Sequence, residues 1–556
     1  MIPKKATCLV LSLCCIAYLL GMFLVPLMDI DAAQYASISR EMLQRKSYLQ
    51  VFDLGKDYLD KPPMLFWLSA LSMKVFGIYD WAYRLPSFLF SILAIYSTFR
   101  LALLFYKREI AILSALILAS CQALFLINHD VRTDTMLMGW VIFSLWQLAE
   151  WYSTKSWLNF LLGFLAIAGG MMTKGPIALM VPAFAFVPHF ILRREWKQLF
   201  RIEYVIGFVI IGLALLPMSW GLYQQYDLHP GKLINNLPIK SGLRFYYWTQ
   251  SFGRFTGENY YHENGYFTFL FENMLWSFLP WVIFFFVGLI YELIVLVQSR
   301  FKLTSKEEWI STGGFIITYC ILARSQAQLP HYIFIVFPLA AIITAKFLYK
   351  LLYTEQFKIW RKILTVFHVF IYILLWSAIV FLLVYPFEAI PKYVACIAAI
   401  CLIIMFYILT MKKNGFPKLL EVSFFTVIGV NIFLNTAFYP TLLKFQMGNT
   451  VSDVLKEENI PSQNTFIYAI GNDYALHFYG NHIFGQRPSI ASMLPTDIII
   501  TAKDSLPVIA QKFPNNTVIY NGKSFGVTQL TFPFLNPNTR EKELDKYVIV
   551  KLEGGK

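Results

Sequence analysis

The sequence predicts a polytopic, all-α membrane domain followed by a small α/β domain at the C-terminus. Hydrophobic residues make up 57% of the 556 positions and charged residues only 14%, whereas a soluble domain is about half apolar and about a quarter charged. The mean hydropathy is +0.55. Long apolar segments recur up to about residue 440, and short β-rich runs replace them afterwards.

The distribution of charge excludes nucleic acid as a partner. The formal net charge is +14, but the basic residues gather in short loops between apolar segments, as the positive-inside rule requires. No basic stripe is interleaved with aromatic residues. The seven cysteines lie in or beside apolar segments without disulfide or zinc spacing, so we assign them to packing.

The first predicted span follows Lys4 and Lys5. Its apolar run, which ends at Met28, is longer than the roughly 7–15 residues of a signal-peptide core and lacks a small-x-small cleavage site, so we expect it to remain in the protein. In all, about thirteen segments are long enough to span a membrane, the fifth and ninth being the shortest. They are 7–28, 86–105, 109–127, 135–152, 157–172, 176–192, 203–223, 274–298, 309–323, 331–349, 363–385, 391–411 and 419–438.

A cytosolic N-terminus places every other loop on the cytosolic side, and each of these loops is basic, in agreement with the positive-inside rule. The basic residues of these loops are Lys107, Arg108, Lys155, Arg193, Arg194, Lys197, Arg201, Arg300, Lys302, Lys306, Lys346, Lys350, Lys358, Arg361, Lys362, Lys412, Lys413 and Lys418. The same topology places two long loops, 29–85 and 224–273, and the tail from about 440 outside the cytosol.

These outer regions have distinct patterns. Within loop 29–85, the amphipathic pieces 35–43 and 64–76 predict helices lying in the membrane interface. The tail has β-rich runs at 465–470, 497–501, 517–520 and 547–552, separated by Asn, Gly and Pro turns. We therefore predict a transmembrane domain over 1–439 and an extracytoplasmic α/β domain over 440–556.

Charged residues on the outer side predict the functional site. Ionisable groups near the hydrocarbon boundary are costly unless they are paired or functional. Charges of both signs on one face predict a site for an anionic substrate with a positioned carboxylate. The basic residues are Lys61, Arg84, Arg132, Lys174, Arg254 and Arg324, and the acidic ones are Asp29, Asp31, Asp60, Asp130, Asp134, Glu258 and Glu272.

Each local pattern also has a structural alternative. Asp29 and Asp31 precede a helical pattern and could cap it. Lys61, in the run Asp60-Lys61-Pro62-Pro63, suits a lipid phosphate, or could extend to ordinary lipid headgroups. Arg132 and Asp134 could form a local ion pair.

Two further basic residues also have alternatives. Lys174 occupies a short outer turn and predicts a ligand contact, with pairing to a nearby acid as the alternative. Arg254 suits a phosphate, or an ion pair with Glu258 one helical turn away. His262 and His331 fit structural histidines, and no spacing supports a metal site, although a divalent metal is compatible with the chemistry. Motifs for nucleotide hydrolysis and for common hydrolases are absent from the sequence.

In combination, these motifs resemble one family, the bacterial aminoarabinose transferases of lipid A modification. These are relatives of the protein O-mannosyltransferases and have the type C glycosyltransferase fold. The motifs are the acid after the first span with the run 34–42, Lys61-Pro62-Pro63, Arg84-Leu85-Pro86-Ser87, Asp134, Thr173-Lys174-Gly175-Pro176 and the run 325–332 that leads to Phe337-Pro338. The resemblance covers most of the membrane region and is strongest through residue 180.

The resemblance implies a polyprenyl (undecaprenyl) phosphate-linked sugar as donor, a lipid or glycan acceptor, and a bacterial inner membrane. It implies that Asp31 and Asp134 are the catalytic acids and that Lys61 and Arg254 bind the donor phosphate. The sequence departs from the family at Gln34, Ala32 and Gln328, which bears on the acceptor and the sugar. With Lys174 as a further phosphate ligand, the remaining cavity candidates are Asp29, Tyr35, Arg84, Arg132, Glu258 and His331.

These residues suit a glycosyltransferase that acts outside the cytosol, by inversion. The two cations would stabilise the leaving phosphate, and Asp31 would orient or deprotonate the acceptor. The alternative is a polytopic lipid or solute transporter or flippase without catalysis, since many spans and intramembrane charges fit that class too. Charges at one membrane face rather than at the midplane favour the transferase.

Overall fold

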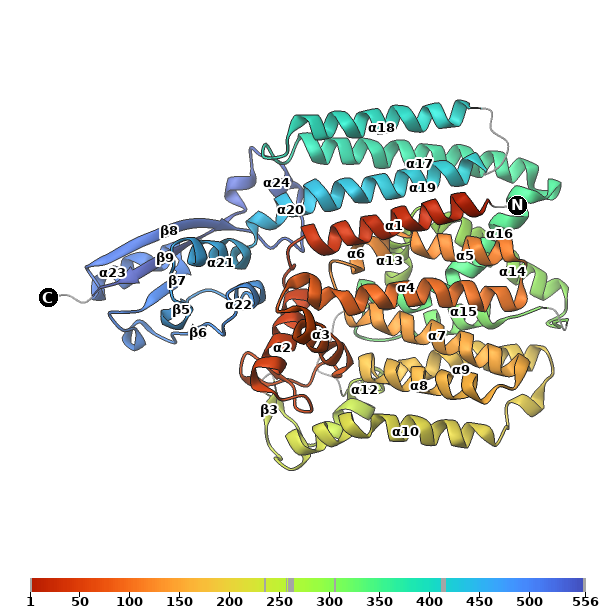
Figure 1. The fold of residues 1–556 in the computed structure, drawn as a ribbon, viewed down its shortest axis with the longest axis horizontal. Helices are drawn as coiled ribbons and strands as arrows, with labels where there is room; N and C mark the ends of the chain where they lie inside the picture. The colour runs from red at the N-terminus through yellow and green to blue at the C-terminus, as the bar shows by residue number, and fades with distance from the viewer. Residues whose placement is uncertain are drawn as a thin grey trace.

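The computed structural model describes residues 3–234, 237–256, 258, 265–304, 307–411 and 417–553. It consists of a long bundle of helices with a smaller sheet-containing domain at one end, and the N-terminus lies at the opposite end of the bundle (Figure 1). Two short helices, α2 (Asp31–Arg45) and α3 (Met64–Phe76), lie at the end of the bundle that faces the sheet domain.

The bundle is built from apolar helices joined by short connections. Its longer helices are α1 (Lys4–Leu24), α4 (Asp80–Phe105), α5 (Arg108–Ala119), α7 (Thr133–Thr154), α8 (Trp157–Lys174), α9 (Ile177–Leu192), α10 (Glu203–Leu222), α14 (Val282–Gln298), α15 (Ile310–Ala323), α16 (Phe337–Tyr353), α17 (Lys358–Val384), α18 (Lys392–Thr410) and α19 (Lys418–Phe433). Shorter pieces are α6 (Gln122–Ile127), α11 (Gly242–Arg244), α12 (Gly253–Thr256), α13 (Phe269–Ser277) and α20 (Tyr439–Leu442), with two-stranded hairpins β1 (Phe52–Asp53)–β2 (Lys56–Asp57) and β3 (Leu233–Ile234)–β4 (Leu237–Pro238).

The chain is a multi-pass membrane protein. Within the described residues, eight helices are long and apolar enough to cross a membrane, and α3, α9, α14 and α15 are shorter apolar helices. Each of the thirteen predicted segments coincides with a helix or a pair of helices. The number of thirteen crossings nevertheless stays a prediction, because five of those segments do not meet the same criterion. Four of them form helices of fewer than 18 residues, and the fifth, α7, is 22 residues long but is not among the eight.

Two predicted spans are broken in the structure for identifiable reasons. The predicted span 109–127 divides into α5 and α6 at Ser120, whose hydroxyl donates to the Leu116 carbonyl at 2.6 Å and accepts from the Trp281 indole at 3.0 Å. The predicted span 274–298 divides into α13 and α14 around Pro280, which cannot donate a backbone hydrogen bond to a continuous helix. In both cases a side chain or an imino acid interrupts an otherwise apolar run.

Arg84 holds together the chain segments at the end of the bundle that faces the C-terminal domain. This fully buried residue of α4 donates to the carbonyl groups of His129 at 3.0 Å, Met22 at 2.8 Å and Pro26 at 2.9 Å. Backbone carbonyls at helix ends lack intrahelical donors, and the guanidinium supplies donors to three of them. The end of α1, the start of α4 and the segment before α7 are therefore fixed to one another.

The C-terminal domain is a five-stranded mixed sheet with short helices. The strand order is β6-β5-β7-β9-β8, with parallel pairing of β5 to β6 and to β7 and antiparallel pairing of β9 to β7 and β8. The elements are α21 (Met447–Glu457), β5 (Thr465–Tyr468), α22 (Tyr474–Tyr479), β6 (Gly485–Gln486), β7 (Ile498–Ala502), α23 (Leu506–Lys512), β8 (Asn516–Ser524), α24 (Phe532–Leu535) and β9 (Asp545–Leu552). The four predicted β-rich runs are all strands, and the two-residue β6 is too short for a sequence pattern.

The C-terminal domain docks on α2 through buried polar contacts. Arg40, fully buried in α2, donates to the backbone carbonyl of His477 and at 3.5 Å to that of Phe478. Tyr479 accepts from the Leu27 amide at 2.8 Å and donates to Asp80 at 3.0 Å. Because α2 also begins at Asp31, the docking of this domain bears directly on the candidate site that contains Asp31.

We expect Arg40→Gln to weaken this docking, because the carbonyls at the end of α22 lose a buried donor. The cost of such unsatisfied groups is about 1–3 kcal/mol. Limited proteolysis of the purified chain should cut the segment before α21 faster in the variant. Arg45→Gln on the same helix, which removes a half-exposed ion pair with Glu41, is the control. Equal proteolysis of both variants would contradict this role for Arg40.

Candidate active site

Two adjoining cavities lie at the end of the bundle that faces the C-terminal domain. The larger is polar and has a volume of about 670 Å³; it lies among α2, the two hairpins, the segment before α16 and the C-terminal domain. The smaller, of about 100 Å³, is mostly apolar and lies among α7, α8, α9 and α15. Both are lined by Lys61 and Tyr332. These two residues therefore stand where a polar space meets an apolar one.

Lys61 is held at this boundary by its sequence neighbours. Its ammonium lies 2.6 Å from the Asp60 carboxylate, and Pro62 and Pro63 follow it directly and lead into α3. Gln250 donates to the carbonyl group of Asp60 and so fixes the turn. Burial lowers the pKa of Lys61, but Asp60 and Tyr35 raise it, and the net pKa lies above its ordinary value. The lysine is therefore a cation.

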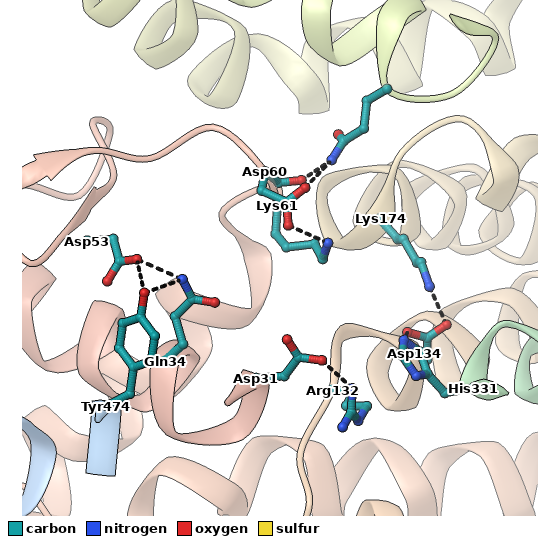
Figure 2. Close-up of polar contacts among 11 residues, drawn as sticks. Asp31, Gln34, Asp53, Asp60, Lys61, Arg132, Asp134, Lys174, His331 and Tyr474 are labelled. Atoms are coloured by element: carbon teal, nitrogen blue, oxygen red, sulfur yellow. Dashed lines mark hydrogen bonds and ion pairs between the residues drawn. The ribbon is translucent and has the colours of Figure 1, made fainter. Parts of the chain in front are cut away.

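Lys174 forms a second buried pair with Asp134. Lys174 ends α8, and Gly175 follows with φ +107°, a left-handed conformation that ends the helix before Pro176 starts α9. Its ammonium lies 2.5 Å from the Asp134 carboxylate and 3.8 Å from the centre of the Tyr332 ring. His331 lies 3.6 Å from the other oxygen of Asp134. Figure 2 shows Lys174 and His331 converging on Asp134.

Asp31 lies in the first turn of α2 and pairs with Arg132. The Arg132 guanidinium contacts the Asp31 carboxylate and lies 3.1 Å from that of Asp130. About a third of the Asp31 side chain, 34%, is exposed, whereas that of Asp134 is only 2% exposed. Asp31 and Tyr35 both line the polar cavity. Of the two predicted catalytic acids, Asp31 is therefore the accessible one, and Asp134 is enclosed by basic partners.

Besides Arg132, which contacts Asp31 but lines neither cavity, three predicted candidates lie away from both cavities. Arg84 is occupied by the backbone carbonyls described above. Asp29 accepts from the Ala475 amide at 3.2 Å, at the contact with the C-terminal domain. Glu258 is exposed and pairs with Arg244 at 3.2 Å. These corrections share a cause: the nearest oppositely charged or polar partner of each residue lies away from the cavity.

Arg254 is part of α12, but its side chain lies outside the part of the chain that the structure describes, as do His262 and Glu263. Within the described residues, no group of three or more His, Cys, Asp or Glu residues could hold a metal ion.

The structure also brings into the cavity residues that the sequence analysis did not select. Gln34 donates to Asp53 at 2.7 Å and to Tyr474 at 3.1 Å, and Tyr474 donates to Asp53 at 3.1 Å. Burial raises the pKa of Asp53 to about 6, although its two hydrogen bonds oppose the shift. Gln34 was noticeable as a departure from the family, but Tyr474 lies in the distant α/β domain and had no local signal.

The comparisons with known proteins agree with this geometry. The family model described as dolichyl-phosphate-mannose-protein mannosyltransferase matches residues 60–220. The undecaprenyl phosphate-alpha-4-amino-4-deoxy-L-arabinose arabinosyl transferase of Wigglesworthia glossinidia brevipalpis is 26% identical over 345 residues, 60% of this chain and 58% of that protein. The protein of the same name from Yersinia enterocolitica is 34% identical over 199 residues, 34% of this chain and 35% of that protein. The matches thus cover less than two thirds of the length of either relative.

The crystal structure of ArnT from Cupriavidus metallidurans bound to undecaprenyl phosphate matches the whole chain. The TM-score is 0.74, with 16% identity and coverage of 100% of both chains. This likeness confirms the predicted fold, a type C glycosyltransferase membrane domain with a small C-terminal α/β domain. The resemblance to the aminoarabinose transferases that the motifs indicate is likewise confirmed by the relatives that match.

The Asp29 carboxyl predicts how docking of the C-terminal domain depends on pH. Burial and the nearby Asp473 raise the pKa of Asp29 from 3.8 to about 8. The docked form therefore holds a proton that the undocked form loses, so docking should weaken as the pH rises from about 4 to 8. Proteolysis of the C-terminal domain as a function of pH measures this, and Asp29→Asn should reduce the dependence. An unchanged profile in that variant would exclude Asp29 as its source.

Removal of one partner from the Lys174–Asp134 pair should be costly. Lys174→Met leaves a buried carboxylate short of a cation, which we expect to lower the unfolding free energy by about 3–5 kcal/mol. The double variant Lys174→Met with Asp134→Leu should recover most of the loss, since no buried charge remains unpaired. Thermal unfolding in detergent compares the three proteins. A double variant as unstable as the single one would show that the pair is not the cause.

Proposed function

We propose that this chain is an integral membrane glycosyltransferase that moves a sugar from a polyprenyl-phosphate carrier, of the undecaprenyl class, to an extracytoplasmic acceptor. The observation that carries the proposal is the meeting of two cavities at Lys61. An amphipathic donor needs an apolar space for its chain and a cation for its phosphate. A polar space must adjoin them for the sugar and the acceptor.

The donor fits the apolar cavity with its phosphate toward the lysines. Leu137, Ile177, Met180 and Ile335 line this cavity and would contact the polyprenyl chain nearest the phosphate. Lys61 and Lys174 both line it as well. A phosphate would compete with Asp60 and Asp134 for these two ammonium groups, and Arg254 is proposed as a third phosphate ligand.

The reaction is a displacement at the anomeric carbon. An acceptor oxygen forms a bond to that carbon while the bond from the carbon to the phosphate oxygen breaks, and the phosphate leaves with the electron pair. Lys61 and Lys174 stabilise the charge that develops on the phosphate. Asp31 orients an acceptor hydroxyl and takes its proton; for a phosphate acceptor no base is needed and Asp31 only positions it. Direct displacement inverts the anomeric configuration.

The surroundings of the site suit this reaction better than transport. The charged groups line the two cavities among α2, α7, α8 and the C-terminal domain, and α2 lies at the end of the bundle that faces that domain (Figure 1). Transporters instead place their substrate sites near the midplane. The relatives are named arabinosyl transferases that use an undecaprenyl phosphate sugar, which supports the donor class. We further propose a bacterial inner membrane location with the N-terminus in the cytosol and the C-terminal domain outside.

Asp31→Asn and Lys61→Ala should each reduce sugar transfer by about 100-fold or more. The first variant loses the proposed base and the second loses a cation at the leaving phosphate. The assay follows labelled sugar from polyprenyl-phosphate donors in membranes to endogenous acceptors, and the labelled product identifies the acceptor.

Lys74→Ala is the matched control, because it removes an exposed lysine from the same outer loop. Gel filtration of each variant in detergent checks that it is folded. If the folded variants transfer sugar normally, the site assignment is wrong. If the wild type transfers nothing from a broad donor panel, the transporter class becomes the better explanation.

A further inference from the structure

The polar cavity has a wall that the membrane domain does not supply. Besides residues of α2 and the β1–β2 hairpin, it is lined by residues of the C-terminal domain. These are Asn472, Tyr474, Ile483, Phe484, Gly485 and Gln486. The Gln486 amide donates to the Asn472 side chain at 2.7 Å, which holds the two segments of this wall together. A soluble domain therefore closes a space that opens beside Asp31.

Gln34, Asp53 and Tyr474 join this wall to the membrane domain. Each of the three side chains contacts both others, at 2.7 to 3.1 Å. One Asp53 oxygen receives both of these bonds, while its other oxygen is buried and has no hydrogen-bond partner within the described residues. A buried carboxylate oxygen without a donor is costly, so a donor group of a ligand fits there.

The position of this group relative to Asp31 separates it from the phosphate site. Figure 2 shows Asp31 between the Gln34–Asp53–Tyr474 group and the Lys174–Asp134 pair. If the donor phosphate lies at Lys61 and Lys174, the sugar lies toward Asp31. The acceptor must then approach from the other side of Asp31, since the entering and leaving oxygens lie on opposite sides of the carbon in a direct displacement. That other side is the wall that contains Tyr474.

We infer that Gln34, Asp53 and Tyr474 bind the acceptor, and that the part they bind is a hydroxyl-rich glycan portion. This inference rests on the proposed function. The chemistry of the wall supports it: Asp53 accepts hydroxyl donors and repels anions, the amides of Asn472 and Gln486 can donate and accept, and Phe484 offers an apolar ring face. The Lys232 cation nearby is paired with Asp57 at 2.8 Å, so it is not a free anion site.

The volume of the cavity is consistent with this role. At about 670 Å³, it falls within the range of about 300–1,000 Å³ found for sites that enclose a drug-sized ligand, which is larger than one sugar ring. The donor sugar and part of an acceptor glycan can therefore occupy it together. The C-terminal domain then selects the acceptor, while the membrane domain binds the donor and carries out the transfer.

Tyr474→Phe in the full-length chain tests the inference. It removes one hydroxyl from the wall and leaves the ring. Labelled sugar is supplied from the polyprenyl-phosphate pool of membranes, and the total glycolipid fraction extracted from the same membranes is titrated as acceptor. We expect the half-saturating acceptor concentration to rise about fivefold, with the maximal rate and the inhibition by added undecaprenyl phosphate unchanged. Gln34→Ala should have the same effect from the membrane side if Tyr474→Phe folds poorly.

Tyr479→Phe is the matched control. Tyr479 belongs to the same helix and bonds across the same domain contact, to Leu27 and Asp80, but does not line the cavity. If Tyr474→Phe titrates like the wild type, or Tyr479→Phe shifts the acceptor curve equally, the inference is overturned while the proposed function stands. If the wild type transfers no sugar at all, the proposed function fails and the inference fails with it.

Discussion

The end of the bundle that faces the C-terminal domain is organised by the cost of keeping cations away from water. Lys61 and Lys174 are both enclosed, and a buried ammonium without a partner costs several kcal/mol. Each therefore lies against a carboxylate, Asp60 at 2.6 Å and Asp134 at 2.5 Å. This requirement explains why helix ends, and the turns before α3 and α9, bring these four residues together. Each lysine–carboxylate pair carries no net charge. An anion binds only if it replaces the carboxylate beside a lysine, and this requirement makes anion binding selective.

The same exchange of partners affects Asp60 and Asp134, the two carboxylates that the lysines contact. When a phosphate occupies the two lysines, each carboxylate loses part of its compensating charge. Asp134 keeps the His331 ring at 3.6 Å, which compensates charge only when that histidine is protonated, whereas Asp60 lies at the cavity edge with 28% of its side chain exposed. Water can therefore compensate Asp60, and the buried Asp134 depends on its protein neighbours.

The membrane domain was predictable from the sequence because its signal is local. Long apolar runs predict helices such as α17 and α18, which the structure contains, and the topology predicted from the basic loops stays a prediction. Lys61, Lys174 and Asp134 were identifiable because they stand at helix boundaries marked by proline or glycine. The breaks at Ser120 and Pro280 were missed, because apolar periodicity hides a single interrupting residue. Arg84 was wrongly predicted to line the cavity. The three carbonyl groups that it binds come from elements distant in sequence, so no local pattern shows them.

The C-terminal domain was only partly predictable from the sequence. Its strands were predicted from β-rich runs, and four of the five are where the pattern placed them. Its contribution to the polar cavity was not predictable, because Tyr474 and Asp53 are 421 residues apart and neither lies in a motif. In the sequence, Gln34 was noticeable only as a departure from the family. In the structure, its side chain donates hydrogen bonds to Asp53 and Tyr474.

The contacts of Gln446 have a consequence for how the protein is made. Its side chain donates to the Leu27 carbonyl at 2.9 Å and accepts from the Asp29 amide at 2.8 Å, across 419 and 417 residues. The segment between α1 and α2 leaves the ribosome well before its partner, which is synthesised more than 400 residues later. Contacts this distant in sequence form late, since the intervening chain must be closed first. The position of Asp31 is therefore completed only after the last helix of the bundle has been inserted, so a nascent chain holds no finished site.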